Sequence, residues 1–307
     1  MVEVAHQGGG PGHNTNVTAM NFTAVNTLNS DVDRAILYYT TTAVFGTGTP
    51  LGAPDVNVAD GITFSGFSQG IARGASGFFW LAYDISSSAT TCTNTVDATQ
   101  VIGDITVDEG VIVSYTDNAT GNRQIEPAAS PTTLVAGDIA MVGMNATDPD
   151  EFTFVLLVDI NGGTVINFTD KGWLAASGFR TGEGTVVWTA SGCDANTCGT
   201  EITIENGSPW TSTSGSVTTN GTFALAMAGD QILAYTGTEA SPTHIAALDN
   251  SGTIGWDADA IDAQTSALPT GLTEGTTCVS TTPDVNVVYN CSTTSGGATA
   301  IRPAVNT

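Results

Sequence analysis

The chain has 307 residues, and its 6 Lys and Arg residues stand against 30 Asp and Glu residues, giving a formal net charge of -24 at pH 7. Nucleic acids and anionic membrane surfaces are bound through clusters of Lys and Arg, so this composition excludes both kinds of partner. The longest apolar run, residues 152–160, contains Asp159 and is far shorter than the roughly 18 residues of a membrane span, so we expect no membrane insertion. The chain opens without the basic and apolar regions of a signal peptide, so we expect the mature form of a secreted protein.

The N-terminal segment, residues 1–13, is Gly-rich and shows no hydrophobic pattern. Such a segment either packs on its own domain or acts as a donor strand that completes the sheet of a neighbouring copy, and both alternatives stay open. Short apolar runs bounded by Gly, Asn, Asp, Pro or Ser then predict strands. In the first half of the chain these are residues 34–45, 61–67, 77–85, 101–107 and 111–115.

Residues 126–133, with two prolines among small residues, interrupt the strand pattern and predict a linker. The best helix candidate is residues 257–268, which are acidic at their start. The pattern predicts an all-β protein of two antiparallel β-sandwich domains in tandem, Ig-like or jelly-roll-like, at residues 1–125 and 134–307. Strands of the second domain are expected at residues 138–144, 152–160, 164–168, 185–189, 201–204, 222–227, 231–235 and 284–289.

Several segments of the first domain resemble a known family. They are Ala35-Ile-Leu-Tyr-Tyr-Thr, Gly77-Phe-Phe-Trp-Leu-Ala-Tyr-Asp, Asn94-Thr-Val-Asp-Ala and Gly121-Asn-Arg-Gln-Ile. Through them, residues 15–125 resemble the N-terminal β-sandwich module of bacterial-neuraminidase-repeat sialidases and of secreted surface proteins. The resemblance implies an ancillary module, because sialidase chemistry sits in a separate propeller and this chain has no Ser-x-Asp-x-Gly-x-x-Trp repeat.

The second domain is similar to an uncharacterised β-rich module of large secreted bacterial surface proteins. The similarity spans nearly all of residues 134–290, and its segments include Phe154-Val-Leu-Leu-Val-Asp-Ile, Ile166-Asn-Phe-Thr-Asp-Lys-Gly-Trp and Gly229-Asp-Gln-Ile-Leu-Ala-Tyr. It implies a secreted or surface-anchored protein, and it transfers no activity to this chain.

Five cysteines indicate the redox compartment. Cys193 and Cys198 bracket a turn-rich segment, and Cys278 and Cys291 flank a predicted turn and returning strand. We expect local disulfides Cys193–Cys198 and Cys278–Cys291 in an oxidising environment. Cys92 is then left as a buried thiol or as a crosslink to another chain. Zinc is disfavoured because the spacings fit no common finger.

Two kinds of side chain are candidates for modification or for cation binding. Glycosylation requires Asn-x-Ser/Thr sequons, and calcium requires several carboxylate and carbonyl oxygens from loops. The sequons are Asn16, Asn21, Asn118, Asn145, Asn167, Asn206, Asn220 and Asn290. The candidate calcium ligands are Asp148, Asp150, Glu151, Asp159 and Asp170, with solvated loop faces as the alternative for such acidic clusters, and we expect no other cofactor.

Five tryptophans could stack on sugars if they were exposed. Trp173, Trp210 and Trp256 lie among Gly, Ser and Asp and are the candidates for such a platform. Trp80 and Trp188 lie in apolar strand patterns, which predicts that they belong to the core.

The sequence favours a non-enzymatic protein. It has a single lysine and three scattered histidines, and its one nucleophile-elbow pattern, around Ser68, is not followed by a helix. We therefore expect an extracellular structural protein, a subunit that self-assembles head to tail into a cell-surface filament or layer through a terminal β-strand. The alternative is a carbohydrate-binding or adhesin module of a larger secreted protein, with glycans as partners.

Overall fold

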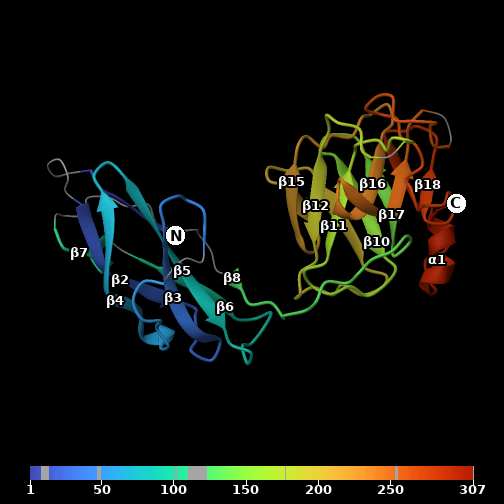
Figure 1. Cartoon of the computed structure of the whole chain (residues 1–307). Coiled ribbons are helices and arrows are strands. Elements are labelled where there is room, and N and C mark those ends of the chain that lie inside the picture. Colours follow the sequence, from blue (N-terminus) through green and yellow to red (C-terminus); the bar gives the residue numbers. More distant parts are fainter. Residues whose placement is uncertain are drawn as a thin grey trace. The chain divides into compact units, whose positions relative to one another are not determined.

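A computed structural model of the chain describes residues 1–7, 14–46, 50–100, 102–109, 123–176, 178–252 and 255–306. The chain forms two compact units, Met1–Glu126 and Pro127–Thr307 (Figure 1). Almost all regular structure is β, which confirms the predicted all-β, sandwich-type fold. The strand expected at residues 111–115, the sequon at Asn118 and residues 8–13 of the expected donor strand lie outside the described residues.

Unit 1 packs two antiparallel sheets against each other. The smaller sheet has the strand order β1-β5-β3, and the larger has the order β4-β2-β6-β8 with β7 also paired to β2. Two short 3-10 helices, Val58–Asp60 and Ile102–Asp104, complete the regular structure. The strands are β1 (Val2–Ala5), β2 (Asn14–Val25), β3 (Val32–Thr40), β4 (Ile62–Ala72), β5 (Ser76–Ile85), β6 (Thr95–Thr99), β7 (Ile105–Val107) and β8 (Arg123–Gln124).

The core of unit 1 follows from alternation along these strands. In β4, Ile62 and Phe64 are fully buried two residues apart, as a half-buried strand requires. In β2 the buried positions change phase, from Val17 to Met20 and Phe22, because the register with β4 shifts between Val17 and Ala19. Such a bulge inserts a residue and turns the following side chains to the other face.

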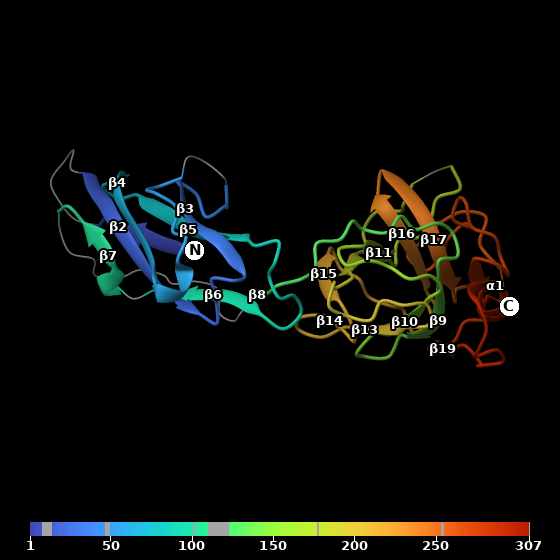
Figure 2. The ribbon, with the colours of Figure 1, turned by 90° about the horizontal axis from the view of Figure 1, so that it is seen from below.

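Unit 2 is a larger sandwich with the strand orders β14-β13-β10-β9-β19 and β15-β12-β11-β16-β17-β18 (Figure 2). All of its strand pairs are antiparallel except β17 with β18. One helix, α1 (Ala298–Val305), follows the last strand. The strands are β9 (Ile139–Asn145), β10 (Glu151–Leu156), β11 (Val165–Thr169), β12 (Thr185–Thr189), β13 (Glu201–Glu205), β14 (Thr211–Ser212), β15 (Ser216–Asn220), β16 (Gln231–Thr238), β17 (Ser241–Asp249), β18 (Cys278–Ser280) and β19 (Asn286–Val288).

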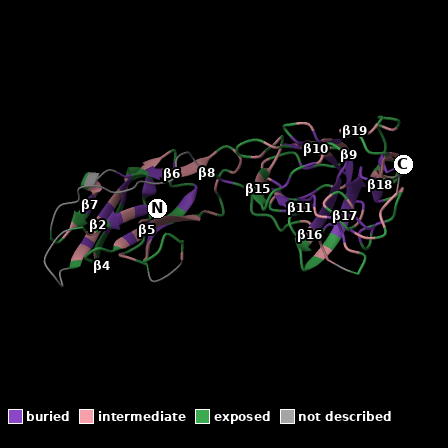
Figure 3. Ribbon diagram, turned by 90° about the horizontal axis from the view of Figure 1, so that it is seen from above, coloured by how far each residue is buried: buried purple, intermediate pink, exposed green. Residues whose placement is uncertain are grey.

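Aromatic rings fill the core between these two sheets, where the buried residues concentrate (Figure 3). Phe154 packs against Phe168 with ring centroids 4.8 Å apart and meets Trp188 edge to face at 5.4 Å. Trp188 is fully buried, as predicted, and its indole N–H donates to the Ser214 carbonyl at 2.7 Å. Aromatic rings therefore pack closely in the interior, and the indole N–H of Trp188 has a hydrogen-bond acceptor.

Two expected elements of unit 2 are absent from the described residues. Residues 222–227 form no strand, because Phe223 and Leu225 are buried from an irregular loop. Residues 257–268 form no helix; Asp257 instead makes an isolated bridge with Ala267, and the described helix is α1. Acidic residues at the start of a segment thus marked a turn-rich loop here and not a helix N-terminus.

Candidate functional site

The first candidate site is the edge of unit 1 at strand β1. Val2–Ala5 pairs antiparallel with β5 over four residue pairs, from Val2 opposite Phe79 to Ala5 opposite Ser76. Val2 and Val4 are 2% and 5% exposed and belong to the core of the unit. The segment expected to be without pattern is therefore an amphipathic strand, and the alternation Val-Glu-Val was the signal that the composition of residues 1–13 obscured.

Gly77 of β5 leaves room for Tyr39 of β3 and Ile71 of β4 at the point where β5 pairs with β1. A Cβ at Gly77, which lies opposite Val4, would come within 2.7 Å of the Tyr39 ring and 3.0 Å of Ile71. The backbone pairing continues past the strand, since the His6 amide donates to the Ala75 carbonyl at 3.0 Å. Burying a valine stabilises by about 1.5–3 kcal/mol, so the two valines of β1 together represent about 3–6 kcal/mol of unit 1 stability. A folded unit 1 therefore needs a strand in this position.

An aromatic cluster lies on the outer face of the same small sheet. Tyr38 of β3 is paired with Trp80 of β5, and Phe45 packs edge to face against both rings, at 6.0 and 5.5 Å. The Trp80 indole N–H donates to Thr40 Oγ1 at 2.8 Å, and Phe45 is 48% exposed. Trp80 therefore does not belong to the core, contrary to the prediction, because its position in β5 alternates with that of the buried Phe79.

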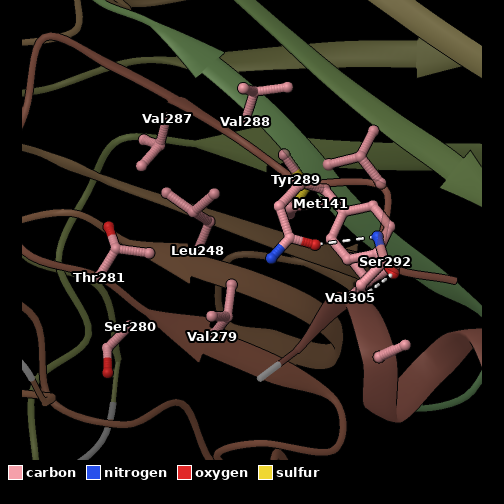
Figure 4. Close-up of a pocket in the computed structure, with 13 residues that line it drawn as sticks. Met141, Leu248, Val279, Ser280, Thr281, Val287, Val288, Tyr289, Ser292 and Val305 are labelled. Atoms are coloured by element: carbon pink, nitrogen blue, oxygen red, sulfur yellow. Dashed lines mark hydrogen bonds between the residues drawn. The ribbon is translucent and has the colours of Figure 1, made fainter.

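The second candidate site is an uncharged groove of about 370 Å³ in unit 2 (Figure 4). It opens between β18 and β19, each the outermost strand of its own sheet, and the end of α1 borders it. Val288, on the edge, is 80% exposed. Its apolar lining includes Met141, Leu248, Val279, Val287 and Val305.

Polar groups make up the rest of the lining of the groove. Its polar lining is Ser280, Thr281, Tyr289, Asn290 and Ser292, with no charged side chain, histidine or cysteine. The Tyr289 hydroxyl is hydrogen-bonded to Ser292 Oγ at 3.0 Å and accepts from the Thr293 amide at 2.7 Å. Ligand pockets of proteins run from about 300 to 1,000 Å³, so this groove is at the small end of that range.

The five candidate calcium ligands are not brought together. Asp150 accepts from the Leu225 amide at 3.1 Å, and Asp159 accepts from the Cys198 amide at 2.8 Å, so each fastens a different loop. Asp148 precedes a cis proline, and Glu151 begins β10. Within the described ranges, no three His, Cys, Asp or Glu side chains are placed to hold a metal ion. Asp170 belongs to a separate group of buried carboxyls.

Three carboxyl groups are buried together near the start of β16. Burial raises the pKa of Asp170 to about 6, although its oxygens accept from the Gly184 and Ala224 amides. Burial raises the pKa of Glu183 to about 7, and the charge of Asp170 adds to the effect. Burial likewise raises the pKa of Asp230 to about 8, with smaller contributions from Asp170 and Glu183. Because both aspartates hold main-chain amides, their role is to fasten loops.

Ser68 and His244, two residue types that a hydrolase would need, lie in a strand and in the core. Ser68 lies inside β4, so the strand-turn-helix of a hydrolase elbow does not form. His244 is buried against Trp173 with ring centroids 4.5 Å apart, and its ring nitrogen contacts the Thr270 carbonyl. Burial lowers the pKa of His244 to about 4, so the ring is neutral at pH 7.

Both predicted disulfide pairings are wrong. Cys92 and Cys193 are each disulfide-bonded, whereas Cys198, Cys278 and Cys291 are free thiols. Cys278 is fully buried in β18, in a small cluster with Leu233, whereas Cys291 is exposed beyond β19, which belongs to the other sheet. Closeness in sequence therefore does not bring this pair together. The disulfide-bonded state of Cys92 and of Cys193 is still compatible with an oxidising compartment.

The sugar-binding tryptophans predicted from composition are not exposed. Trp173 is 6% exposed, Trp210 packs on the core of unit 2, and the Trp256 indole N–H donates to Glu274 at 2.5 Å. The sequons keep their status as candidates. Asn220 and Asn290 are exposed, and the half-buried sequon residues are Asn16, Asn21, Asn145, Asn167 and Asn206.

Comparisons with known proteins identify no relative. No family model matches the chain, and neither the curated proteins nor the solved structures include a match. The resemblance to the sialidase-associated module and to the second surface module therefore stays a prediction. Among the described residues, no helix has the length and apolar character needed to cross a membrane.

Proposed function

We propose that this chain is a non-enzymatic extracellular structural protein whose copies assemble into a cell-surface filament or layer by β-strand addition. The observation that supports it most directly is β1, a short edge strand that buries Val2 and Val4 through pairing with β5 alone. Main-chain pairing of this kind joins chains without using charged side chains. That matters for a protein with a net charge of -24, whose copies repel one another.

The chemistry of the described residues supports a structural role. The buried aspartates hold main-chain amides, the groove of unit 2 lacks catalytic side chains, and the disulfide fits a secreted protein. Divalent cations or salt would screen the acidic surface where copies meet. Glycans on exposed sequons such as Asn220 would lie at the surface without disturbing either sandwich core.

Sedimentation velocity of the full chain over a range of concentrations, with calcium present, tests the proposal. We expect large assemblies for the parent chain and for Glu3→Gln, because Glu3 alternates with the buried valines of β1. We expect Val4→Asp to prevent assembly, since a charge would be placed in the core edge. A parent chain that stays monomeric at every concentration, or a Val4→Asp chain that assembles equally well, contradicts the proposal.

A second candidate function is carbohydrate binding, and the aromatic cluster of Tyr38, Phe45 and Trp80 favours it. Aromatic faces bordered by hydrogen-bonding groups suit sugar rings, and the Arg34–Asp84 ion pair joins the same two strands. A glycan array with Phe45→Ala, and with Val44→Ala as the matched exposed control, tests it. Binding by the parent that Phe45→Ala alone abolishes supports a binding module, and an array without binding rejects it.

A further inference from the structure

We propose that copies of this chain are joined by exchange of β1, so that Val2–Ala5 of one copy occupies the β5 edge of unit 1 in the next. This inference rests on the proposed function and names the surface through which assembly takes place. The occupant is a second copy of the same chain. The acceptor edge is the one that β1 occupies within a single chain.

The fit of donor to acceptor is already visible in one chain. Each residue of β1 has a partner on β5, and Val2 and Val4 are buried in the core of the unit. The same strand arriving from another copy would make the same hydrogen bonds and bury the same valines. No new surface has to be complementary, which is why exchange of an element is an accessible route to assembly.

The topology separates β1 from the rest of its chain. β1 lies in the sheet β1-β5-β3, whereas the next strand, β2, lies in the sheet with β4 and β6. Its strand pairing is with β5 alone, so release breaks one strand pairing and exposes Val2 and Val4. Residues 8–13, Gly-Gly-Gly-Pro-Gly-His, connect the two strands, and six residues can span up to about 20 Å when extended. That reach allows the donor strand to enter a neighbouring copy.

The direction of exchange decides the product. If two copies exchange strands reciprocally, a closed dimer forms; if each copy donates to the next, the contact is heterologous and an open chain grows. Closure within one chain competes with exchange at an effective concentration of about a millimolar, so high local concentration favours the open chain. Exchange also brings few charges together, because Glu3 is the only charged residue of β1.

The groove of unit 2 is the competing acceptor for a donor strand. It offers the three-residue edge strand β19 and an uncharged lining, but no strand is seated in it. The β5 edge is favoured because four residue pairs in register are seen there. The experiment below therefore includes a cysteine at each acceptor.

Mixed single-cysteine chains test the exchange. Glu3 and Phe78 are opposite one another on β1 and β5, so cysteines at these positions in two different chains meet only if β1 crosses between copies. The background carries Cys198→Ser and Cys291→Ser, which remove the two exposed free thiols. A tagged Glu3→Cys chain is mixed with an untagged Phe78→Cys chain or Val288→Cys chain and oxidised, and assembly is measured in the same sample.

We expect a tagged–untagged crosslink with Phe78→Cys, at least several-fold more abundant than with Val288→Cys. A crosslink with Val288→Cys instead overturns the exchange and assigns the groove as acceptor. Assembled samples without either crosslink overturn the exchange but leave the structural function standing. Samples that neither assemble nor crosslink overturn both.

The double variant Glu3→Cys/Phe78→Cys in one chain provides a second readout that does not depend on mixing. Its oxidised form locks β1 onto its own β5, and we expect the locked chain to remain monomeric. Reduction should restore assembly, with the parent chain under the same reductant as control for the native disulfide. Assembly by the locked, oxidised chain overturns the proposal.

Discussion

Replacing Glu183 by Gln should stabilise unit 2 at pH 8 and leave it nearly unchanged at pH 5. Glu183 has a side chain that is 12% exposed, and its Oε2 has no hydrogen-bond partner. Its nearest cation is Arg180, 3.6 Å away, in an ion pair that is too long to be strong. The ionised Glu183 carboxylate thus loses its hydration and gains few favourable contacts in return. Gln carries no charge and avoids this loss.

The magnitude follows from the pKa of Glu183. It rises from 4.5 to about 7 in the folded chain, because of burial first and of the Asp170 charge second. At about 1.4 kcal/mol per pKa unit, the ionised group destabilises the folded state by at most about 3 kcal/mol. Since the folded state binds more protons than the unfolded state between these two pKa values, stability is lost as pH rises from about 4.5 to about 7. The attraction of Arg180 and Lys171 is already part of this pKa, so it is not subtracted again.

Thermal unfolding at pH 5 and pH 8 provides the assay. A net gain of about 1–2.5 kcal/mol at pH 8 corresponds to a rise in Tm of about 2–8 °C for a domain of this size, with little change at pH 5. The control is Glu205→Gln, which removes the same charge from an exposed position at the end of β13. An equal effect of both variants, or an effect of Glu183→Gln that does not depend on pH, would refute the reasoning.

Three further outcomes are expected. Gly77→Ala should lower the free energy of unfolding of unit 1 by about 1–3 kcal/mol in chemical denaturation, because the added Cβ meets Tyr39 at 2.7 Å. Calcium and EDTA should leave the Tm of unit 2 equal at matched ionic strength, since the predicted ligands lie apart; a saturable rise with calcium would show a site. In mass-spectrometric alkylation, Cys291 should react in the folded chain and Cys278 only on unfolding, because burial, followed by the charge of Glu274, raises the pKa of the Cys278 thiol.

The sequence predicted elements well where strands are strongly apolar. The run beginning at Phe152 gave β10, because its side chains are buried on both faces of the strand near the centre of a sheet. β2 was missed, since its long segment from Asn14 is rich in Asn and Thr and its bulge breaks the period of two. Alternation is a reliable signal only while the register is regular.

The sequence did not predict which residues far apart in the chain contact one another. Cys193 and Cys198 are close in the chain, yet spacing alone does not say which thiols meet in three dimensions. The aromatic cluster of Tyr38, Phe45 and Trp80 depends on the register of β3 with β5, which no local pattern fixes. The strand β1 was missed for a different reason. Its four residues were treated as one segment with the glycines that follow them, and the composition of that segment is not typical of a strand.

Cryo-electron microscopy of the assembled protein shows most directly which copy supplies the strand that pairs with β5. We predict a chain of repeated subunits in which the strand paired with Gly77 and Phe78 leads, beyond Gln7, to β2 of a neighbouring copy. Density that leads back to β2 of the same copy, or a sample that contains only single subunits, would contradict the account.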